Sequence, residues 1–171
     1  MSAENANPES EFIFSREFDA PIQLVWNAWA EAEHLAKWWG PKDFDLTIYK
    51  FEFKPEGEFH YGMKAHNGFE MWGKFIFKEM TAPNKLTYIS GFADRNGHLS
   101  RAPFFDDKWP MEIFNEVTFT EKNGKTTICL KAVPVNAERD EVNVFIDTFK
   151  SMQIGFGGTF DKLEEHLSQT K

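Results

Sequence analysis

Hydrophobic and polar residues alternate along several short stretches of the chain, and this period of two predicts half-buried β-strands. A change of phase within 44–53 predicts a β-bulge near Ile48-Tyr49. Asn67-Gly68 and Asn123-Gly124 predict tight hairpins, the first with a type I′ turn that needs positive φ at both residues. The predicted strands cover 12–18, 44–53, 59–64, 69–78, 86–92, 111–119 and 126–133.

Apolar residues recur at spacings of three and four in three other places, and this spacing predicts helices. A first short helix starts at Pro21 and covers about 22–29. A second covers 31–38 and is ended by Gly40-Pro41, and a long third helix covers about 138–168.

Gly155, Gly157 and Gly158 interrupt the apolar stripe of the predicted long helix. Each glycine inside a helix costs about 1 kcal/mol relative to alanine. The sequence therefore predicts either that the helix bends at these glycines or that the sheet approaches its backbone closely.

The order of these elements predicts an α+β fold, because the helices are segregated from a run of hairpins. The sheet has to bury one apolar face, and the long helix carries a matching stripe. We predict a strongly curved antiparallel sheet of about six to seven strands wrapped around the C-terminal helix, with the two short helices closing one end. This single domain covers 12–168, and residues 1–11 are expected to form a disordered N-terminal tail.

Composition and charge narrow the possible functions. Hydrophobic residues make up 42% of the chain, which excludes wholesale disorder, and the 16% of aromatic residues must pack a core, line a pocket or meet a partner. The net charge of −8 argues against binding to nucleic acid or to anionic membrane surfaces. No apolar run approaches the roughly 20 residues of a spanning helix. The single cysteine, Cys129, excludes an internal disulfide and favours a reducing cytoplasm.

No spacing of residues predicts catalytic or metal chemistry. The five histidines include no His-x-x-x-His pair, so we expect no metal and no cofactor. Cys129 is expected to be a buried structural thiol, and no serine lies in a Gly-x-Ser-x-Gly context. Glu112 would suit a general acid or base at the mouth of a cavity, but its alternation with Met111 and Ile113 points it to solvent.

Aromatic and methionine residues gather on the faces that the predicted sheet and long helix turn toward each other. They either fill the core or line an adaptable pocket, and the interrupted helix favours the pocket. The irregular segment 93–110 is expected to cover it as a lid. The predicted ligand-binding residues are Tyr61, Met63, Met71, Phe75, Tyr88, Phe149, Met152 and Phe156 in the walls, with Phe104, Phe105 and Trp109 in the lid.

Six short motifs follow one another through most of the chain: Arg16–Pro21, Val25-Trp26, Trp38–Pro41, Gly57–Phe59, Trp109-Pro110 and the closing stretch Gly155–Leu163. In order and spacing they resemble the AHSA-type branch of the START-like (SRPBCC) superfamily. The resemblance runs from about Phe12 to Leu167. One position departs from it, because Phe156 stands where the closing motif usually has tryptophan, which should alter the pocket more than the fold.

The resemblance implies a helix-grip fold, in which the space between the sheet and the long helix often holds an apolar ligand. Activities within the superfamily range from ligand carriage to cyclases and hydrolases, so the fold alone does not give the function. The branch is named for a eukaryotic co-chaperone that activates the heat-shock-protein-90 ATPase. That protein carries an additional amino-terminal chaperone-binding domain, for which we expect no room in this chain.

Three functions remain open at this point. The first is cytoplasmic binding of a small apolar molecule or lipid between the sheet and the C-terminal helix. The second is a co-chaperone-like interaction module that acts on a heat-shock ATPase. The third is an enzyme, a cyclase or hydrolase of a hydrophobic metabolite.

Overall fold

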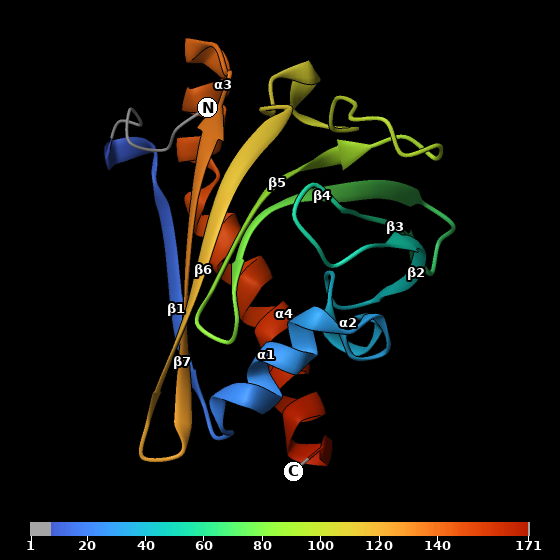
Figure 1. Ribbon diagram of the computed structural model, residues 1–171. Helices are drawn as coiled ribbons and strands as arrows, with labels where there is room; N and C mark the ends of the chain where they lie inside the picture. Colours follow the sequence, from blue (N-terminus) through green and yellow to red (C-terminus); the bar gives the residue numbers. More distant parts are fainter. Residues whose placement is uncertain (1–7, 171) are drawn as a thin grey trace.

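The computed structural model describes residues 8–170 and shows one curved sheet that holds a long helix on its concave side (Figure 1). All seven strands are antiparallel, in the order β1-β7-β6-β5-β4-β3-β2. This is the predicted α+β helix-grip fold. The strands are β1 (Phe12–Phe18), β2 (Phe44–Phe51), β3 (Glu58–Ala65), β4 (Glu70–Thr81), β5 (Lys85–Ala93), β6 (Glu112–Lys122) and β7 (Lys125–Val135).

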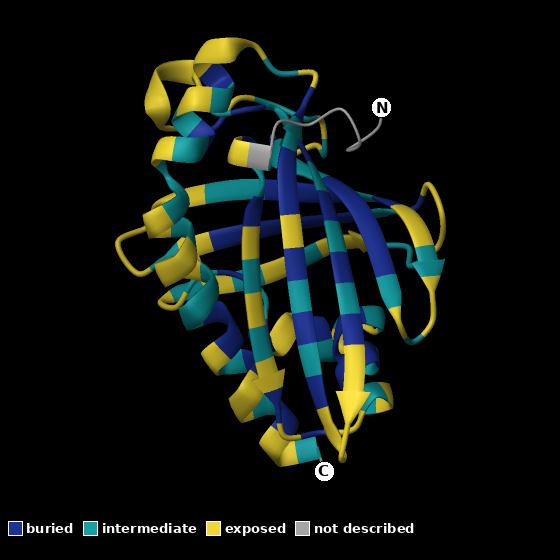
Figure 2. Cartoon of the chain, turned by 90° about the vertical axis from the view of Figure 1, so that its left-hand side faces the viewer, coloured by how far each residue is buried: buried dark blue, intermediate teal, exposed yellow. Residues whose placement is uncertain are grey.

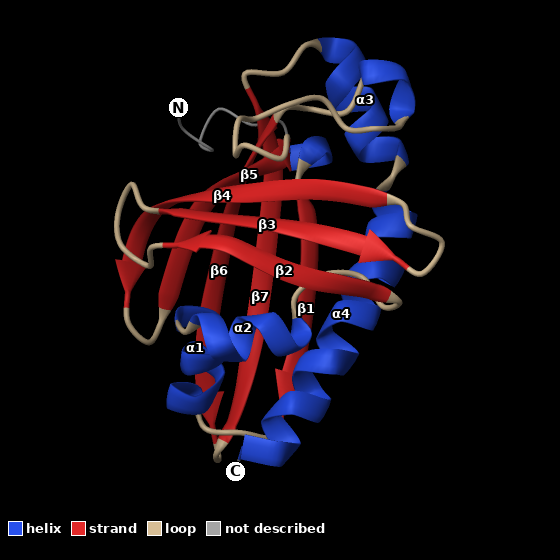
Figure 3. Cartoon of the chain, turned by 90° about the vertical axis from the view of Figure 1, so that its right-hand side faces the viewer, coloured by secondary structure: helices blue, strands red, loops and turns tan. Residues whose placement is uncertain are grey.

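Two short helices, α1 (Ile22–Ala30) and α2 (Ala32–Trp38), follow the first strand as predicted. They lie beside the C-terminal part of the long helix and close one end of the sheet (Figure 3). The rings of Trp29 and Trp38 meet edge to face at 5.0 Å, and both contact Phe160 of the long helix. The indole nitrogen of Trp38 donates a hydrogen bond of 2.9 Å to the carbonyl oxygen of Ala28. This end of the domain is therefore solidly packed.

In β1, β6 and most of β7 the degree of burial alternates along the strand with the predicted period (Figure 2). In β6, for example, Ile113, Asn115, Val117 and Phe119 are buried in turn. In β3 and β4, His60 and Lys74 are buried on the face expected to be polar. The predicted bulge is confirmed by a register shift between Ile48 and Lys50 in the pairing of β2 with β3.

The turn at Asn67-Gly68 is not of the predicted type I′. Only Gly68 has a positive φ, of 92°, and backbone hydrogen bonds join Ala65 to both Gly68 and Phe69. This is the pattern of a three-residue hairpin loop whose last residue is left-handed. At Asn123 and Gly124 both φ values are positive, so the two-residue turn lies there.

The long helix predicted over 138–168 is divided in two, α3 (Arg139–Asp147) and α4 (Phe149–Thr170). The division lies at Thr148, whose hydroxyl donates a hydrogen bond of 2.6 Å to the carbonyl of Val144. A separate start for α3 is encoded by a capping box between Glu138 and Glu141.

The sheet does not approach the backbone of α4 closely at its glycines. The close approach that the sequence offered as one of two explanations is therefore wrong. A Cβ atom at Gly155 or Gly157 would meet nothing within 4 Å. At Gly158 it would make an ordinary contact of 3.6 Å with the side chain of Lys42. The helix runs through all three residues, and they leave open space beside it.

The expected tail falls largely outside the described residues, which exclude 1–7. Pro8–Ser10 forms a short 3-10 helix in which Ser10 is buried. No helix in the part of the chain that is described is long and apolar enough to cross a membrane.

Candidate ligand cavity

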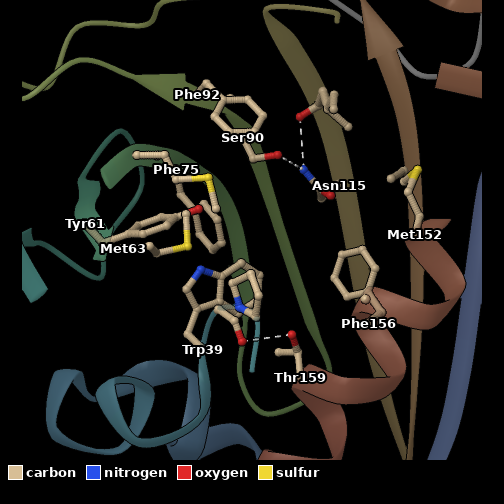
Figure 4. A pocket seen from close by; sticks show the side chains of 18 of the residues that line it. Trp39, Tyr61, Met63, Phe75, Ser90, Phe92, Asn115, Met152, Phe156 and Thr159 are labelled. Carbon is tan, nitrogen blue, oxygen red and sulfur yellow. Dashed lines mark hydrogen bonds between the residues drawn. The ribbon is translucent and has the colours of Figure 1, made fainter. Parts of the chain in front are cut away.

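A cavity of about 300 Å³ lies between the sheet and α4, on the side away from the packed α1–α2 end (Figure 4). Strands β3 to β7 supply one wall, and α3 and α4 supply the other. The segment Trp39–Pro41, just after α2, closes the floor. The volume is at the lower end of the range for small-molecule pockets.

The walls of the cavity are aromatic and sulfur-containing, and no charged side chain lines it within the described residues. Phe75 and Tyr88 stack at 4.0 Å between ring centroids, and the ring of Trp39 meets Phe75 edge to face. Gly73 makes room for a third ring, because a Cβ atom there would lie 2.5 Å from the hydroxyl oxygen of Tyr61. Flexible methionines complete an adaptable apolar surface.

Eight of the eleven residues predicted to contact a ligand lie in this lining. They are Tyr61, Met63, Met71, Phe75, Tyr88, Trp109, Met152 and Phe156. Met71, Phe75 and the two tyrosines come from neighbouring strands, whereas Met152 and Phe156 face them one helical turn apart on α4.

The other three predicted residues lie outside the lining. Phe149 packs against Phe12 of β1 and Phe145 of α3, at 5.5 Å and 5.4 Å between ring centroids. Phe104 and Phe105 are 41% and 40% exposed. Phe105 stacks on the outer face of Trp109 at 5.2 Å, so only Trp109 of the predicted lid reaches the cavity.

Polar contacts join the segment that carries Trp109 to α3. Arg101 donates a hydrogen bond of 3.2 Å to the carbonyl oxygen of Trp109, and its guanidinium pairs with the carboxylate of Glu141. Lys108 lies 3.9 Å from Asp140. The segment and α3 thus cover the cavity together.

Several lining residues escaped the sequence prediction: Trp39, Ser90, Phe92, Asn115, Phe145 and Thr159. Asn115 had a detectable signal, because it has the same parity as three buried apolar residues of β6. The hydroxyl of Thr159 donates a hydrogen bond of 3.0 Å to the carbonyl oxygen of Gly40. The two residues are 119 positions apart, so no local sequence pattern shows this contact.

The two tyrosine hydroxyls of the cavity are held in their neutral form. Burial raises the pKa of Tyr61 to about 12. Burial also raises the pKa of Tyr88 strongly, and the phenolate charge that Tyr61 would carry raises it further. The hydroxyls are therefore hydrogen-bonding groups, not acids, at physiological pH.

Other candidate residues lie apart from the cavity. Glu112 is half-buried and accepts a hydrogen bond of 3.1 Å from the side chain of Asn136. His60 is buried on the outer face of the sheet, 3.1 Å from the carbonyl of Asp94. Among residues 8–170, no three histidine, cysteine or acidic side chains are grouped as metal ligands.

A curved sheet gripping a helix, with an apolar cavity between them, defines the chain as a START-like helix-grip domain. The profile of the family described as "Activator of Hsp90 ATPase homolog 1-like protein" matches residues 19–168. The chain belongs to this family. No curated protein matches it significantly.

Solved bacterial structures share the fold over nearly the whole chain. A protein of Arthrobacter aurescens superposes with a TM-score of 0.78 at 23% identity, covering 98% of this chain and 93% of that one. A protein of Staphylococcus epidermidis gives 0.76 at 25% identity, with coverages of 96% and 93%. A protein of Mycobacterium smegmatis gives 0.74 at 22% identity, with coverages of 92% and 90%.

Proposed function

We propose that this protein binds a small, neutral, largely apolar molecule in the cavity between the sheet and α4. The observation that supports the proposal is an uncharged lining of aromatic and methionine side chains around about 300 Å³ of space. Burying an ion in such a lining would cost far more than burying a neutral group. We further propose that it acts in the cytoplasm, where its single cysteine would stay reduced.

A neutral hydrophobic dye, N-phenyl-1-naphthylamine, tests the proposal through its fluorescence increase on binding. Met152→Trp places a large ring in the cavity and should weaken dye binding. Ile154→Trp is the matched control, because Ile154 lies two residues further along α4 and is 71% exposed. Equal binding by the two variants, or no binding by the unmodified protein, would count against the cavity as the site.

A second candidate function follows from the description of the family, which names an activator of the Hsp90 ATPase. In this case the domain would contact the chaperone through its surface, and the cavity would be incidental. Its test is the ATPase rate of a bacterial Hsp90-type chaperone with and without the domain. Stimulation that survives Met152→Trp would favour this function over ligand binding.

Catalysis has less support in the residues that line the cavity. A hydrolase or cyclase needs a nucleophile or an acid–base pair beside its substrate. The polar groups on the side chains around this cavity are hydroxyls, indole N–H groups and one amide. We therefore propose binding and not catalysis.

A further inference from the structure

Asn115 places a polar group in the wall of an otherwise apolar cavity. It lies on β6, is 5% exposed and points to the same side as Ile113 and Val117. Its amide nitrogen lies 3.0 Å from the carbonyl oxygen of Ile113, 3.4 Å from that of Tyr88 and 2.9 Å from Oγ of Ser90 (Figure 4).

These partners fix which way the amide faces. The carbonyls of Ile113 and Tyr88 can only accept hydrogen bonds, so the NH₂ end of Asn115 must face them. The amide oxygen is then the end of the side chain that does not face these carbonyls, and Asn115 lines the cavity. No described residue donates a hydrogen bond to this oxygen.

Ser90 completes a donor and acceptor pair. Its Oγ accepts a hydrogen bond from Nδ2 of Asn115, so the hydroxyl proton of Ser90 remains available for another acceptor. Ser90 also lines the cavity. At this part of the wall the cavity therefore presents an acceptor, Oδ1 of Asn115, and a donor, the hydroxyl of Ser90, on paired strands, in addition to the hydroxyls of Tyr61 and Tyr88.

A ligand that displaces water from this wall has to supply a donor to the amide oxygen of Asn115, because an acceptor left without a partner costs free energy. We propose that the cavity selects a neutral molecule with an apolar body and one hydroxyl group, an alcohol or a phenol. The ligand hydroxyl donates to Oδ1 of Asn115 and accepts from Oγ of Ser90, while its apolar body contacts Met152, Phe156 and Phe75. This inference rests on the proposed function, since it specifies the ligand of the same cavity.

The two polar groups also discriminate against other ligands. A hydrocarbon leaves Oδ1 of Asn115 without a partner. A carboxylate brings a negative charge against this oxygen, and no cationic side chain among the described lining residues compensates for it. A hydroxyl is a small neutral group that satisfies both atoms at once through a single oxygen.

Three molecules of one shape test the selection: naphthalene, 1-naphthol and 1-naphthoate, with binding measured by calorimetry near neutral pH. We expect 1-naphthol to bind about tenfold more tightly than naphthalene, because one or two net hydrogen bonds increase the affinity by about this factor. We expect 1-naphthoate to bind more weakly than 1-naphthol. Equal affinities for naphthalene and 1-naphthol would overturn the inference and leave the proposed function standing. If none of the three binds, both fail.

Variants assign the preference to the two residues. Asn115→Leu removes the acceptor at similar volume and should abolish the preference for 1-naphthol while retaining naphthalene binding. Ser90→Ala, which leaves the contacts of Asn115 with both carbonyls intact, should reduce the preference even if Asn115→Leu does not fold. Ser151→Ala is the control, because Ser151 is exposed on α4 and lies outside the lining of the cavity. An unchanged preference in Ser90→Ala, or one lost in Ser151→Ala, would contradict the assignment.

Discussion

Nδ1 of His34 lies 2.8 Å from Nε2 of His166, so a hydrogen bond between two imidazoles joins α2 to the last turns of α4. One ring must donate and the other must accept, which requires at least one of them to be neutral. Burial lowers the pKa of His166 from its ordinary 6.5, and the positive charges of His34 and Lys37 lower it further.

This pair predicts a loss of stability in mild acid. A histidine whose pKa is lower in the folded state binds protons more readily when unfolded. The contribution of His166 to the free energy of unfolding should therefore be fully present above pH 6.5, its pKa in the unfolded chain. It should decrease as the pH falls below 6.5. His166→Asn should flatten this part of the profile, measured by urea unfolding between neutral pH and about pH 5. His66→Asn, at an exposed hairpin position, is the control. Parallel profiles for His166→Asn and the unmodified protein would contradict the prediction.

Two glycines in open space separate backbone strain from packing. A Cβ atom at either Gly68 or Gly157 would meet nothing within 4 Å, but Gly68 has a φ of 92° and Gly157 lies inside α4. Gly68→Ala should lower the unfolding free energy by about 1–2 kcal/mol because alanine is strained in the left-handed region. Gly157→Ala should raise it by up to about 1 kcal/mol through helix propensity. Destabilisation by both substitutions in thermal or urea unfolding would show that the space beside α4 is not open.

The fold could be predicted from the sequence because periodicity reports which face of an element is buried. The alternation in 111–119 and 126–133 and the spacing of apolar residues in α1 each match the structure. The pattern reports no contact between distant segments, however. His34 and His166 are 132 residues apart, and nothing near either one indicates the pairing. Lys74 and His60 show the same limit, because the turn after β5 covers the outer face of the sheet that alternation assigned to solvent.

The candidate site could be predicted only in part, for related reasons. Strand residues such as Tyr61 and Phe75 were found because strand parity places them inside. Phe149 was wrongly included in the lining, because it shares the helical face of Phe156 and periodicity does not show that its ring packs against Phe12 of β1. Trp39 was missed because it lies past the end of α2, where no periodicity applies.

Met152 distinguishes a cavity wall from a sealed core. It is half-buried and faces the cavity, whereas Leu163 of the same helix is fully buried in the packed end. Leu163→Ala should cost about 2–5 kcal/mol, because a void is left among well-packed neighbours. Met152→Ala should cost less, since its side chain already borders empty space, and it should enlarge the cavity for bulkier ligands. Equal losses in urea unfolding would indicate that the cavity is filled by side chains.

The buried tyrosines predict a second loss of stability, at alkaline pH. The pKa of Tyr61 is raised from its ordinary 10.0 to about 12, and that of Tyr88 is raised as well. A group with a raised pKa in the folded state contributes stability that is complete below the unfolded value and is lost as the pH rises toward the folded one. Above pH 10.0, each tyrosine should therefore lower the unfolding free energy by about 1.4 kcal/mol per pH unit.

Tyr61→Phe isolates one of these contributions, because it removes the ionisable hydroxyl and keeps the ring against Phe59 and Phe75. Its unfolding free energy, measured by urea at several pH values above 10, should fall less steeply than that of the unmodified protein. Tyr49→Phe provides the comparison, because Tyr49 is 48% exposed and lies outside the cavity. If Tyr49→Phe flattens the alkaline profile as much as Tyr61→Phe does, ionisation of the cavity tyrosines is not what limits stability there. A ligand that excludes water from the cavity should shift the loss to still higher pH in the unmodified protein, because it stabilises only the folded state with neutral tyrosines.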